Sequence, residues 1–347
     1  MKWLLFGCMI LECIVVSARE WPLWDGKETV ASYAARVKLP ATKAIDLGNN
    51  LTLELVLIPP GKFMMGSQDL AQSYGTIEEA IGMMILGAIL TVVLFVLLRM
   101  NYRKNQRRHF SLGWLVLLTF TVGLFFGGIA RGYAVGVQAH ELKKHVVLGL
   151  AYNEFPAHSV TISKPFYMGK YSVTYEQSDI VLRTNMGQYM NPKHVAVGNS
   201  SWNMAVDFCR KIKGYLPTEA QWEYACRAGT TTRFYTGDKE SDLDRAGWYY
   251  LNTRNRNECV VGEKVANAFG LFDMHGNVSQ WCEDWFGEYK GESQVDPKGP
   301  LSGTRRVLRG GSYWTMGTDC RSASRSCEST DGENRIFGFR VCMPVEE

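Results

Sequence analysis

Two long uncharged stretches constrain the fold of this chain more than any other feature of its sequence. Residues 80–98 and residues 112–130 are each nineteen residues long and contain no charged side chain. With a rise of about 1.5 Å per residue, a helix of this length crosses the roughly 30 Å hydrocarbon core of a bilayer. Helices of water-soluble domains seldom stay uncharged for so long. The pattern therefore predicts a two-helix transmembrane hairpin over residues 80–130.

The loop between the two stretches indicates their orientation. It contains no acidic residue and five basic ones, Arg99, Arg103, Lys104, Arg107 and Arg108. Short loops rich in Lys and Arg stay on the cytoplasmic side of a membrane. We therefore expect both outer ends of the hairpin, and the main domain with them, on the extracytoplasmic side, in a periplasm or at a cell surface. Neither stretch carries an ionisable residue, so the hairpin is expected to be an anchor and not a transport path.

The N-terminus has the pattern of a secretory signal peptide over residues 1–19. Lys2 supplies the positive start, residues 3–16 the apolar core, and residues 16–18 the small-residue end. Glu12 interrupts the apolar core, so an uncleaved anchor helix is the alternative. A signal peptide would deliver the following segment to the same side as the outer ends of the hairpin.

The composition narrows the function classes only slightly. The 38 basic and 34 acidic residues give a net charge of +4, which is too small to argue for a nucleic-acid partner. The chain also has 34 Gly, 10 Trp, 16 Tyr and 16 Phe. This mixture is typical of a loop-rich fold whose turns use glycine and whose core is filled by aromatic rings.

The N-terminal half outside the hairpin predicts few regular elements. Residues 20–50 are expected to form a stalk with one short helix over 28–37, followed by a turn at Gly48. Residues 51–58 predict a strand, because they alternate and then become continuously apolar. Residues 160–171 predict two short strands separated by Pro165.

Two helices are expected in the C-terminal half. Residues 201–213 have apolar side chains at helical spacing and end at Gly214. Thr218 and Gln221 form a capping box that opens a second helix, which Gly229 closes. From Gly237 onward the sequence predicts turns and short strands with almost no helix.

Eight segments, in this order, resemble the formylglycine-generating enzyme (sulfatase-modifying factor) family. They are LVLIPPGKFMMGS at 55–67, EFPAHSVTISKPFYMGKYSVT at 154–174, SWNMAVDFCRKI at 201–212, LPTEAQWEYACRAGT at 216–230, NAFGLFDMHGNVSQWCEDWF at 267–286, RVLRGGSY at 306–313, CRSASR at 320–325 and GFRVC at 338–342. The resemblance implies an irregular α+β domain related to C-type lectins. This domain would comprise residues 51–68 and 152–345 and be interrupted by the hairpin.

The family contains enzymes of several kinds, and resemblance alone does not choose among them. Some members are copper oxidases that convert a sulfatase Cys into formylglycine, some are iron-dependent sulfoxide synthases, and many bacterial members have no assigned chemistry. The iron-dependent members use an H-x3-H-x-E pattern, which the six His residues of this chain do not form.

The resemblance places the copper site of the oxidases after Ser312. The first copper Cys of the family corresponds to Thr315, and the second corresponds to Cys320. Cu(I) is a soft ion that prefers sulfur, and a hydroxyl does not replace a thiolate. The active-site Trp of the oxidases is also missing, because Ser279 stands in its place. The sequence therefore argues against a two-Cys copper site, and it leaves Cys320 and Ser312 as the candidate catalytic residues.

Cys320 has a second interpretation. Counting back from Gly338 places it within two residues of a structural half-cystine of the family, whose partner corresponds to Cys226. The resemblance suggests a second disulfide between Cys209 and Cys342. Seven cysteines follow the signal segment, and thiols in an oxidising compartment tend to pair.

A calcium site is the other cofactor that the resemblance implies. Its ligands would be the side chains of Asp273 and Gln280 and the carbonyls of Gly276 and Val278. The family usually has Glu where this chain has Gln280, so a charged ligand is lost and calcium binding should weaken.

Two functions remain open at this point. The first is a membrane-anchored binding or scaffold module, with a protein or peptide partner, that has lost the oxidase site. The alternative is an enzyme of the family that modifies a protein Cys, as a formylglycine-generating oxidase does, or another thiol substrate.

Overall fold

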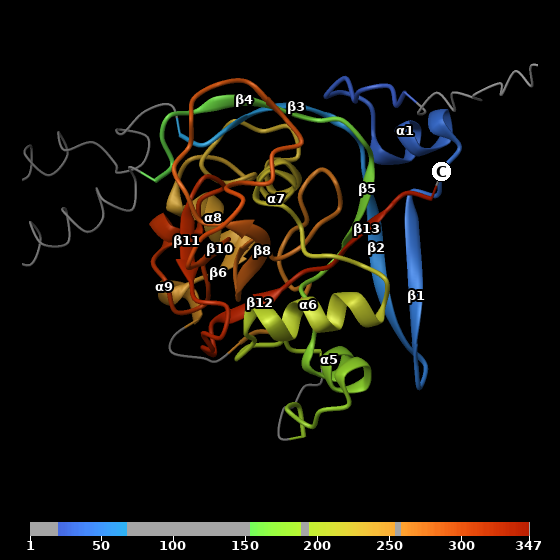
Figure 1. Ribbon diagram of the computed structural model, residues 1–347, viewed down its shortest axis with the longest axis vertical. Helices are drawn as coiled ribbons and strands as arrows, with labels where there is room; N and C mark the ends of the chain where they lie inside the picture. The colour runs from blue at the N-terminus through green and yellow to red at the C-terminus, as the bar shows by residue number, and fades with distance from the viewer. Residues whose placement is uncertain (1–19, 68–152, 189–193, 254–257, 347) are drawn as a thin grey trace, which may run out of the picture.

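The computed structural model describes residues 20–67, 153–188, 194–253 and 258–346 (Figure 1). The expected signal peptide and the expected hairpin lie outside these residues. Within the described part of the chain, no helix is long and apolar enough to cross a membrane.

The main sheet joins the two ends of the described chain. Its order is β1 (Thr42–Gly48), β2 (Leu51–Ile58), β5 (Phe166–Gly169) and β13 (Cys342–Pro344), and all neighbours are antiparallel. The β1–β2 turn uses Asn49 and Asn50 at positive φ angles of 53° and 60°. Asn tolerates this left-handed conformation better than most residues do. The predicted turn and strand are confirmed.

Residues 20–50 are part of the folded domain, so the predicted stalk is wrong. The predicted helix is present as α1 (Val30–Val37), and Thr29 caps it by accepting a hydrogen bond from the Ser32 amide. Tyr33 and Ala34 on this helix are buried in the core. Strand β1 was missed because its side chains are never fully buried, so the sequence shows no clear apolar alternation there.

A second sheet supports the C-terminal half. Its order is β11 (Arg325–Glu328), β10 (Arg306–Arg309), β8 (Ser279–Trp285) and β12 (Phe337–Phe339). Strand β12 runs parallel to β8, whereas the other pairs are antiparallel. Two-stranded pairing of β6 (Gly247–Trp248) with β7 (His275–Gly276) extends this region.

A third sheet contains β3 (Gly61–Met65), β4 (His158–Ile162) and β9 (Gln294–Val295). Strands β3 and β4 are antiparallel, and Met65 pairs with His158. Beyond this pair, the Ser67 amide donates to the Glu154 carbonyl at 3.1 Å. The chain therefore leaves and re-enters the domain at neighbouring points on either side of residues 68–152.

The helices begin where the sequence offers caps. Helix α6 (Trp202–Lys211) is capped by Ser201, and α7 (Glu219–Arg227) has both halves of the Thr218–Gln221 capping box. These two predictions are confirmed. Three short helices were not predicted: α5 (Tyr175–Leu182), α8 (Glu240–Ala246) and α9 (Tyr250–Thr253). A 3-10 turn, η1, spans Gly317–Cys320.

Helix α7 is the element that positions the polar interior. Trp222 and Tyr224 pack into the core, but Glu219, Glu223 and Arg227 are also buried. Figure 1 shows α7 surrounded by strands and loops of the domain. The described domain is therefore α+β, rich in short strands and irregular segments, and the predicted class is confirmed at that level.

Candidate functional site

The loop after β10 brings Ser312, Thr315 and Cys320 together. The Ser312 amide donates to Thr315 Oγ1 at 2.8 Å, and Thr315 Oγ1 lies 3.6 Å from Cys320 Sγ. Gly311, with φ of 67°, allows this arrangement. A Cβ atom there would lie 2.7 Å from Cys320 Sγ and 2.9 Å from Thr315 Oγ1. The residues at the two copper positions of the family therefore face each other as a hydroxyl and a thiol.

Cys320 is a protonated thiol in this environment. Its side chain is fully buried, and burial raises the pKa of Cys320 to about 12. The hydroxyl of Thr315 donates to the Ser312 carbonyl at 3.1 Å. In the contact between Thr315 and Cys320, either group can be the donor. Cys320 is therefore a thiol, and not the thiolate that nucleophilic attack requires.

Cys320 is not bonded to Cys226, so the predicted disulfide is wrong. Cys226 is a thiol whose Sγ atom lies 3.7 Å from Ser322 Oγ. The half-cystine position that was placed within two residues of Cys320 is thus occupied by Ser322. Cys209 and Cys342 are also unbonded thiols, so the second predicted pairing is not formed either.

Ser279 lies at the start of β8, close to the loop of Ser312. It is buried, and its amide donates to the Ile336 carbonyl at 2.7 Å. Two residues earlier, the Asn277 carbonyl accepts from the Tyr313 amide at 2.9 Å. The small Ser279 side chain thus lies in the region where the oxidases are expected to have a Trp ring.

An exposed apolar surface lies beside this loop. It consists of Trp314, Tyr250, Leu251 and Met316, which are 56%, 40%, 54% and 40% exposed, and we call it the Trp314 patch. The Tyr250 and Trp314 rings meet edge to face, with centroids 5.9 Å apart. The Tyr250 amide donates to the Thr315 carbonyl at 2.9 Å, which joins α9 to the loop. Large exposed side chains that gather in this way are typical of an interaction surface.

Two of the four expected calcium ligands, Gln280 and Asp273, lie near Arg340. Gln280 Oε1 accepts from Trp222 Nε1 at 2.8 Å and from Arg340 Nε at 3.1 Å, and Gln280 Nε2 donates to the Asp273 carbonyl at 2.9 Å.

Asp273 is the expected ligand whose side chain has an oxygen atom available for a further contact. Burial raises the pKa of Asp273 to about 6, and its Oδ1 atom has no hydrogen-bond partner. The Arg340 guanidinium already supplies positive charge nearby, and Gln280 has no free oxygen lone pair to spare. Among the described residues, no group of three or more His, Cys, Asp or Glu could hold a metal ion. The set therefore fits a calcium ion poorly, and calcium binding stays a prediction.

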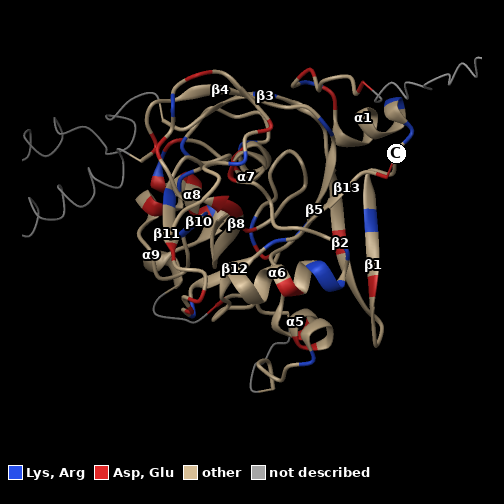
Figure 2. Ribbon diagram, in the orientation of Figure 1, with Lys and Arg blue, Asp and Glu red and all other residues tan. Residues whose placement is uncertain are grey.

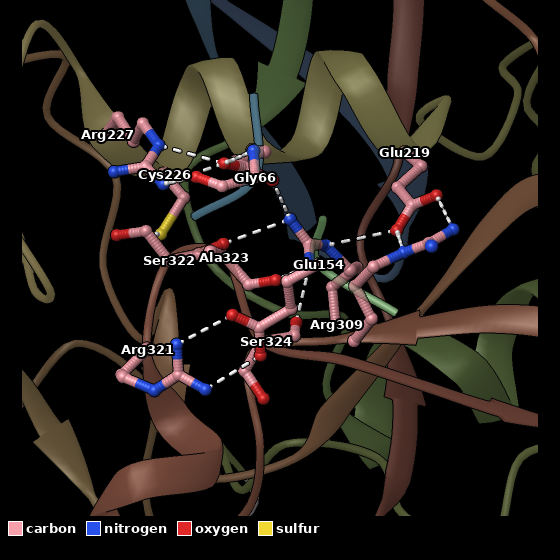
Figure 3. Close-up of polar contacts among 12 residues, drawn as sticks. Gly66, Glu154, Glu219, Cys226, Arg227, Arg309, Arg321, Ser322, Ala323 and Ser324 are labelled. Atoms are coloured by element: carbon pink, nitrogen blue, oxygen red, sulfur yellow. Dashed lines mark hydrogen bonds and ion pairs between the residues drawn. The ribbon is translucent and has the colours of Figure 1, made fainter. Parts of the chain in front are cut away.

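A buried network of carboxylates and arginines was not predicted (Figure 3). Glu223 pairs with Arg309 and, at 2.8 Å, with Arg227, while Arg325 binds Glu219 through two contacts of 2.6 and 2.7 Å. In each pair both side chains are almost fully buried. Acidic and basic residues at these positions read as exposed charges in the sequence, because only the tertiary fold brings the partners together.

The network extends to the points where the chain leaves and re-enters the domain on either side of residues 68–152. The Gly66 amide donates to Glu223 Oε1 at 2.9 Å. Arg321 binds Glu154 through two contacts of 2.7 Å, and Ser67 Oγ donates to the same carboxylate at 2.8 Å. Because Arg321 follows Cys320 directly, η1 is tied to the point where the chain re-enters the domain.

Comparison with known proteins identifies the family. The model of the sulfatase-modifying factor enzyme 1-like domain matches residues 135–344. The chain belongs to this family.

Two curated relatives illustrate the range of this family. The formylglycine-generating enzyme of Streptomyces coelicolor is 38% identical over 171 residues, which are 45% of this chain and 54% of the enzyme. The serine/threonine-protein kinase pkn1 of Chlamydia caviae is 36% identical over 158 residues, which are 44% of this chain and 25% of the kinase. The chain thus spans about half or less of the length of these two relatives.

Solved structures support the fold. Variable protein 1 of Treponema denticola has a TM-score of 0.60 and 20% identity, covering 88% of this chain and 100% of that protein. PvdO from Pseudomonas aeruginosa has a TM-score of 0.58 and 19% identity, covering 87% of this chain and 98% of that protein. At these identities the likeness concerns the fold alone.

Proposed function

We propose that the protein is a membrane-anchored, extracytoplasmic binding or scaffold module of the sulfatase-modifying factor family that lacks the two-Cys copper oxidase site. The observation that carries this proposal is the 3.6 Å contact between Thr315 Oγ1 and the Cys320 thiol. A soft cuprous ion needs sulfur ligands, and only one of the two positions offers sulfur. The residues present therefore do not fit copper, and no reaction step is assigned to it.

The Trp314 patch supports the binding role. Its four side chains surround the loop in which the family carries its chemistry, and they are accessible, unlike Cys320. A protein or peptide partner fits such a surface, because rigid aromatic side chains bury much area at little entropic cost. Figure 2 shows basic and acidic residues interspersed along the described chain, which gives no support for a nucleic-acid partner.

Membrane anchoring is proposed from the sequence, and the closeness of the two chain ends that flank residues 68–152 supports it. The pairing of Met65 with His158 and the bond between Ser67 and Glu154 bring the two ends of residues 68–152 together. Two spans starting and ending on one side of a bilayer require adjacent ends of this kind.

The alternative is an enzyme that modifies a thiol substrate. Its support is the 38% identity with the Streptomyces coelicolor enzyme and the presence of Ser312 and Cys320. The Thr315 contact and the pKa of Cys320 argue against oxidase chemistry in particular.

Copper binding tests the proposal directly. Purified wild-type protein should bind no stoichiometric Cu(I) and should not convert a Cys-containing sulfatase peptide to formylglycine. Thr315→Cys combined with Ser279→Trp should take up copper, because two thiols would then face each other. Thr318→Cys is the matched control, since Thr318 lies on η1 but its side chain is exposed, whereas Cys320 is buried. Copper-dependent turnover by the wild-type protein would refute the non-catalytic function.

The anchoring is tested separately. In a protein whose partly exposed Cys259 and Cys327 are replaced by Ser, a cysteine placed at Asn105 should react with an impermeant thiol reagent only from the cytoplasmic side, whereas one at Ser302 in the described domain should react only from outside. Reaction of both positions from one side would refute the proposed hairpin.

A further inference from the structure

A cationic cavity lies away from the Thr315 loop, between the β3–β4 pair and the C-terminal end of α7. Its volume is about 580 Å³. No carboxylate side chain is among the residues that line it. The polar side chains in the lining are those of Lys62, Arg227, Arg233, Arg321, Ser67, Ser159, Tyr224, Thr230, Thr231 and Thr232. Four positive side chains that share a cavity without a lining carboxylate indicate an anionic ligand.

Two of the four cations are fixed by hydrogen bonds to neighbouring groups, which for Arg227 include the carbonyls of the lining residues Gly66 and Thr232. Arg227 donates through Nε to Glu223 at 2.9 Å and through Nη2 to the Gly66 carbonyl at 3.1 Å. Arg321 is held by its two contacts with Glu154, which Figure 3 shows together with Arg227. Guanidinium groups held in this way lose little side-chain entropy when they bind a ligand.

Burial and the neighbouring Arg321 both disfavour the charged form of Arg233. The pKa of Arg233 is lowered first by burial and then by the nearby charge of Arg321. Asp238, Glu240 and Glu154 act in the opposite direction but do not cancel these effects. An anion between the two guanidinium groups would replace this repulsion with two attractions.

The C-terminal end of α7 lies at this cavity, and its carbonyl groups would repel an anion. Asn267 Nδ2 donates to the Ala225 and Cys226 carbonyls at 2.7 and 3.1 Å, and Thr230 Oγ1 donates to the Arg227 carbonyl at 2.9 Å. These donors satisfy the last carbonyls of the helix, which weakens their repulsion of an anion.

We propose that this cavity binds the phosphate group of a small ligand or of a lipid headgroup. A phosphate offers several acceptor oxygens, which match guanidinium groups that approach from different directions. The remaining wall is apolar, with Trp24, Phe63 and Met64, and accommodates an apolar portion of the ligand. Ser67, which lines the cavity, directly precedes residues 68–152. The lipid as a source rests on the proposed membrane anchoring, whereas phosphate recognition does not.

The test uses the full chain purified in a neutral detergent. Inorganic phosphate, glycerol 3-phosphate, and short-chain phosphatidylglycerol and phosphatidylcholine of equal acyl length are titrated by calorimetry. Saturable binding of the soluble phosphates identifies a free phosphate as a sufficient ligand. Binding of phosphatidylglycerol at least about tenfold tighter than the soluble phosphates, and tighter than phosphatidylcholine, identifies an anionic lipid.

Variants decide whether the cavity is responsible. Arg233→Ala should weaken binding of the preferred probe by about tenfold or more, as expected for the loss of a charge-assisted contact. Lys62→Ala, on the exposed part of β3, should weaken it without affecting folding, and Arg233→Lys should restore part of the loss. Arg305→Ala is the matched control, because Arg305 is exposed and does not line the cavity. Absence of saturable binding to every probe, or equal losses in Arg233→Ala and Arg305→Ala, would overturn the proposal.

Discussion

Replacing Glu223 with Gln tests whether the buried network holds the domain together. The side chains of Glu223 and Arg309 are both 0% exposed, so neither charge can turn to solvent when its partner is lost. Gln keeps the shape of Glu but carries no charge. Its amide group would also place N–H donors against at least one of the existing donors, which are the Gly66 amide, Arg227 and Arg309.

The expected cost follows from this burial. Breaking a buried ion pair by removing one partner typically costs about 3–5 kcal/mol. The more distant Glu219, 3.7 Å from Arg309 Nε, compensates part of the lost charge, so we expect about 3 kcal/mol. For a domain of this size that loss lowers the melting temperature by roughly 6–12 °C.

Thermal and urea unfolding, followed by tryptophan fluorescence, measure this effect. Glu54→Gln is the matched control, because Glu54 pairs with Lys170 at 2.9 Å but is 53% exposed. An exposed pair contributes at most about 1 kcal/mol, so the control should unfold almost like the wild-type protein. If the two Gln variants lost equal stability, the buried network would not carry the energy assigned to it here.

Three further outcomes are expected. Burial raises the folded-state pKa of Asp284 to about 7, so the free energy of unfolding should fall by up to about 4 kcal/mol as the pH rises from about 4 to 7. Asp284→Asn should remove this fall, and an unchanged pH profile of the variant would contradict the prediction. Millimolar calcium should leave the melting temperature unchanged, because Gln280 Oε1 is already occupied; a rise that Asp273→Asn abolishes would show calcium binding. In folded protein at pH 8, mass spectrometry should find the half-exposed Cys327 alkylated and the buried Cys320 unmodified, and equal modification would contradict the assigned burial.

Local signals in the sequence predicted the elements that depend on local interactions. The capping box of Thr218 and Gln221 needs only four consecutive residues, and both of its hydrogen bonds are present. The Ser201 cap and the strand over residues 51–58 are of the same kind, because their hydrogen-bonding or apolar pattern is complete within one short segment.

The missed features depend on partners far apart in the sequence. Strand β1 is held by its pairing with β2 and not by a strong apolar pattern of its own. The partner of Cys226 is Ser322, 96 residues away, and counting in the sequence could not distinguish it from Cys320 because the loop length after Ser312 is not fixed by local rules. Glu223 and Arg309 are 86 residues apart, and nothing in either segment marks them as a buried pair.

The RGGS segment that carries much of the family resemblance is explained by folding alone. Arg309 is buried and donates to the carbonyls of Ala323 and Ser324 at 2.7 and 2.5 Å as well as to Glu223, so it organises the strand and loop around it. Gly310 adopts a φ of 92°, and a Cβ atom there would lie 3.0 Å from the Trp222 ring. These requirements hold whether or not a metal is bound nearby.

The positions that are expected to differ from the oxidases are not explained by such requirements of the fold. Thr315 and Ser279 stand where the resemblance leads us to expect a copper Cys and an active-site Trp, and each is accommodated here by ordinary hydrogen bonds of the loop and strand. Retention of the folding residues therefore says little about catalysis, and the proposed loss of the copper site rests on Thr315, whose hydroxyl offers no sulfur ligand. The match to the family model shows the family, whereas the binding function that we propose depends on these two positions.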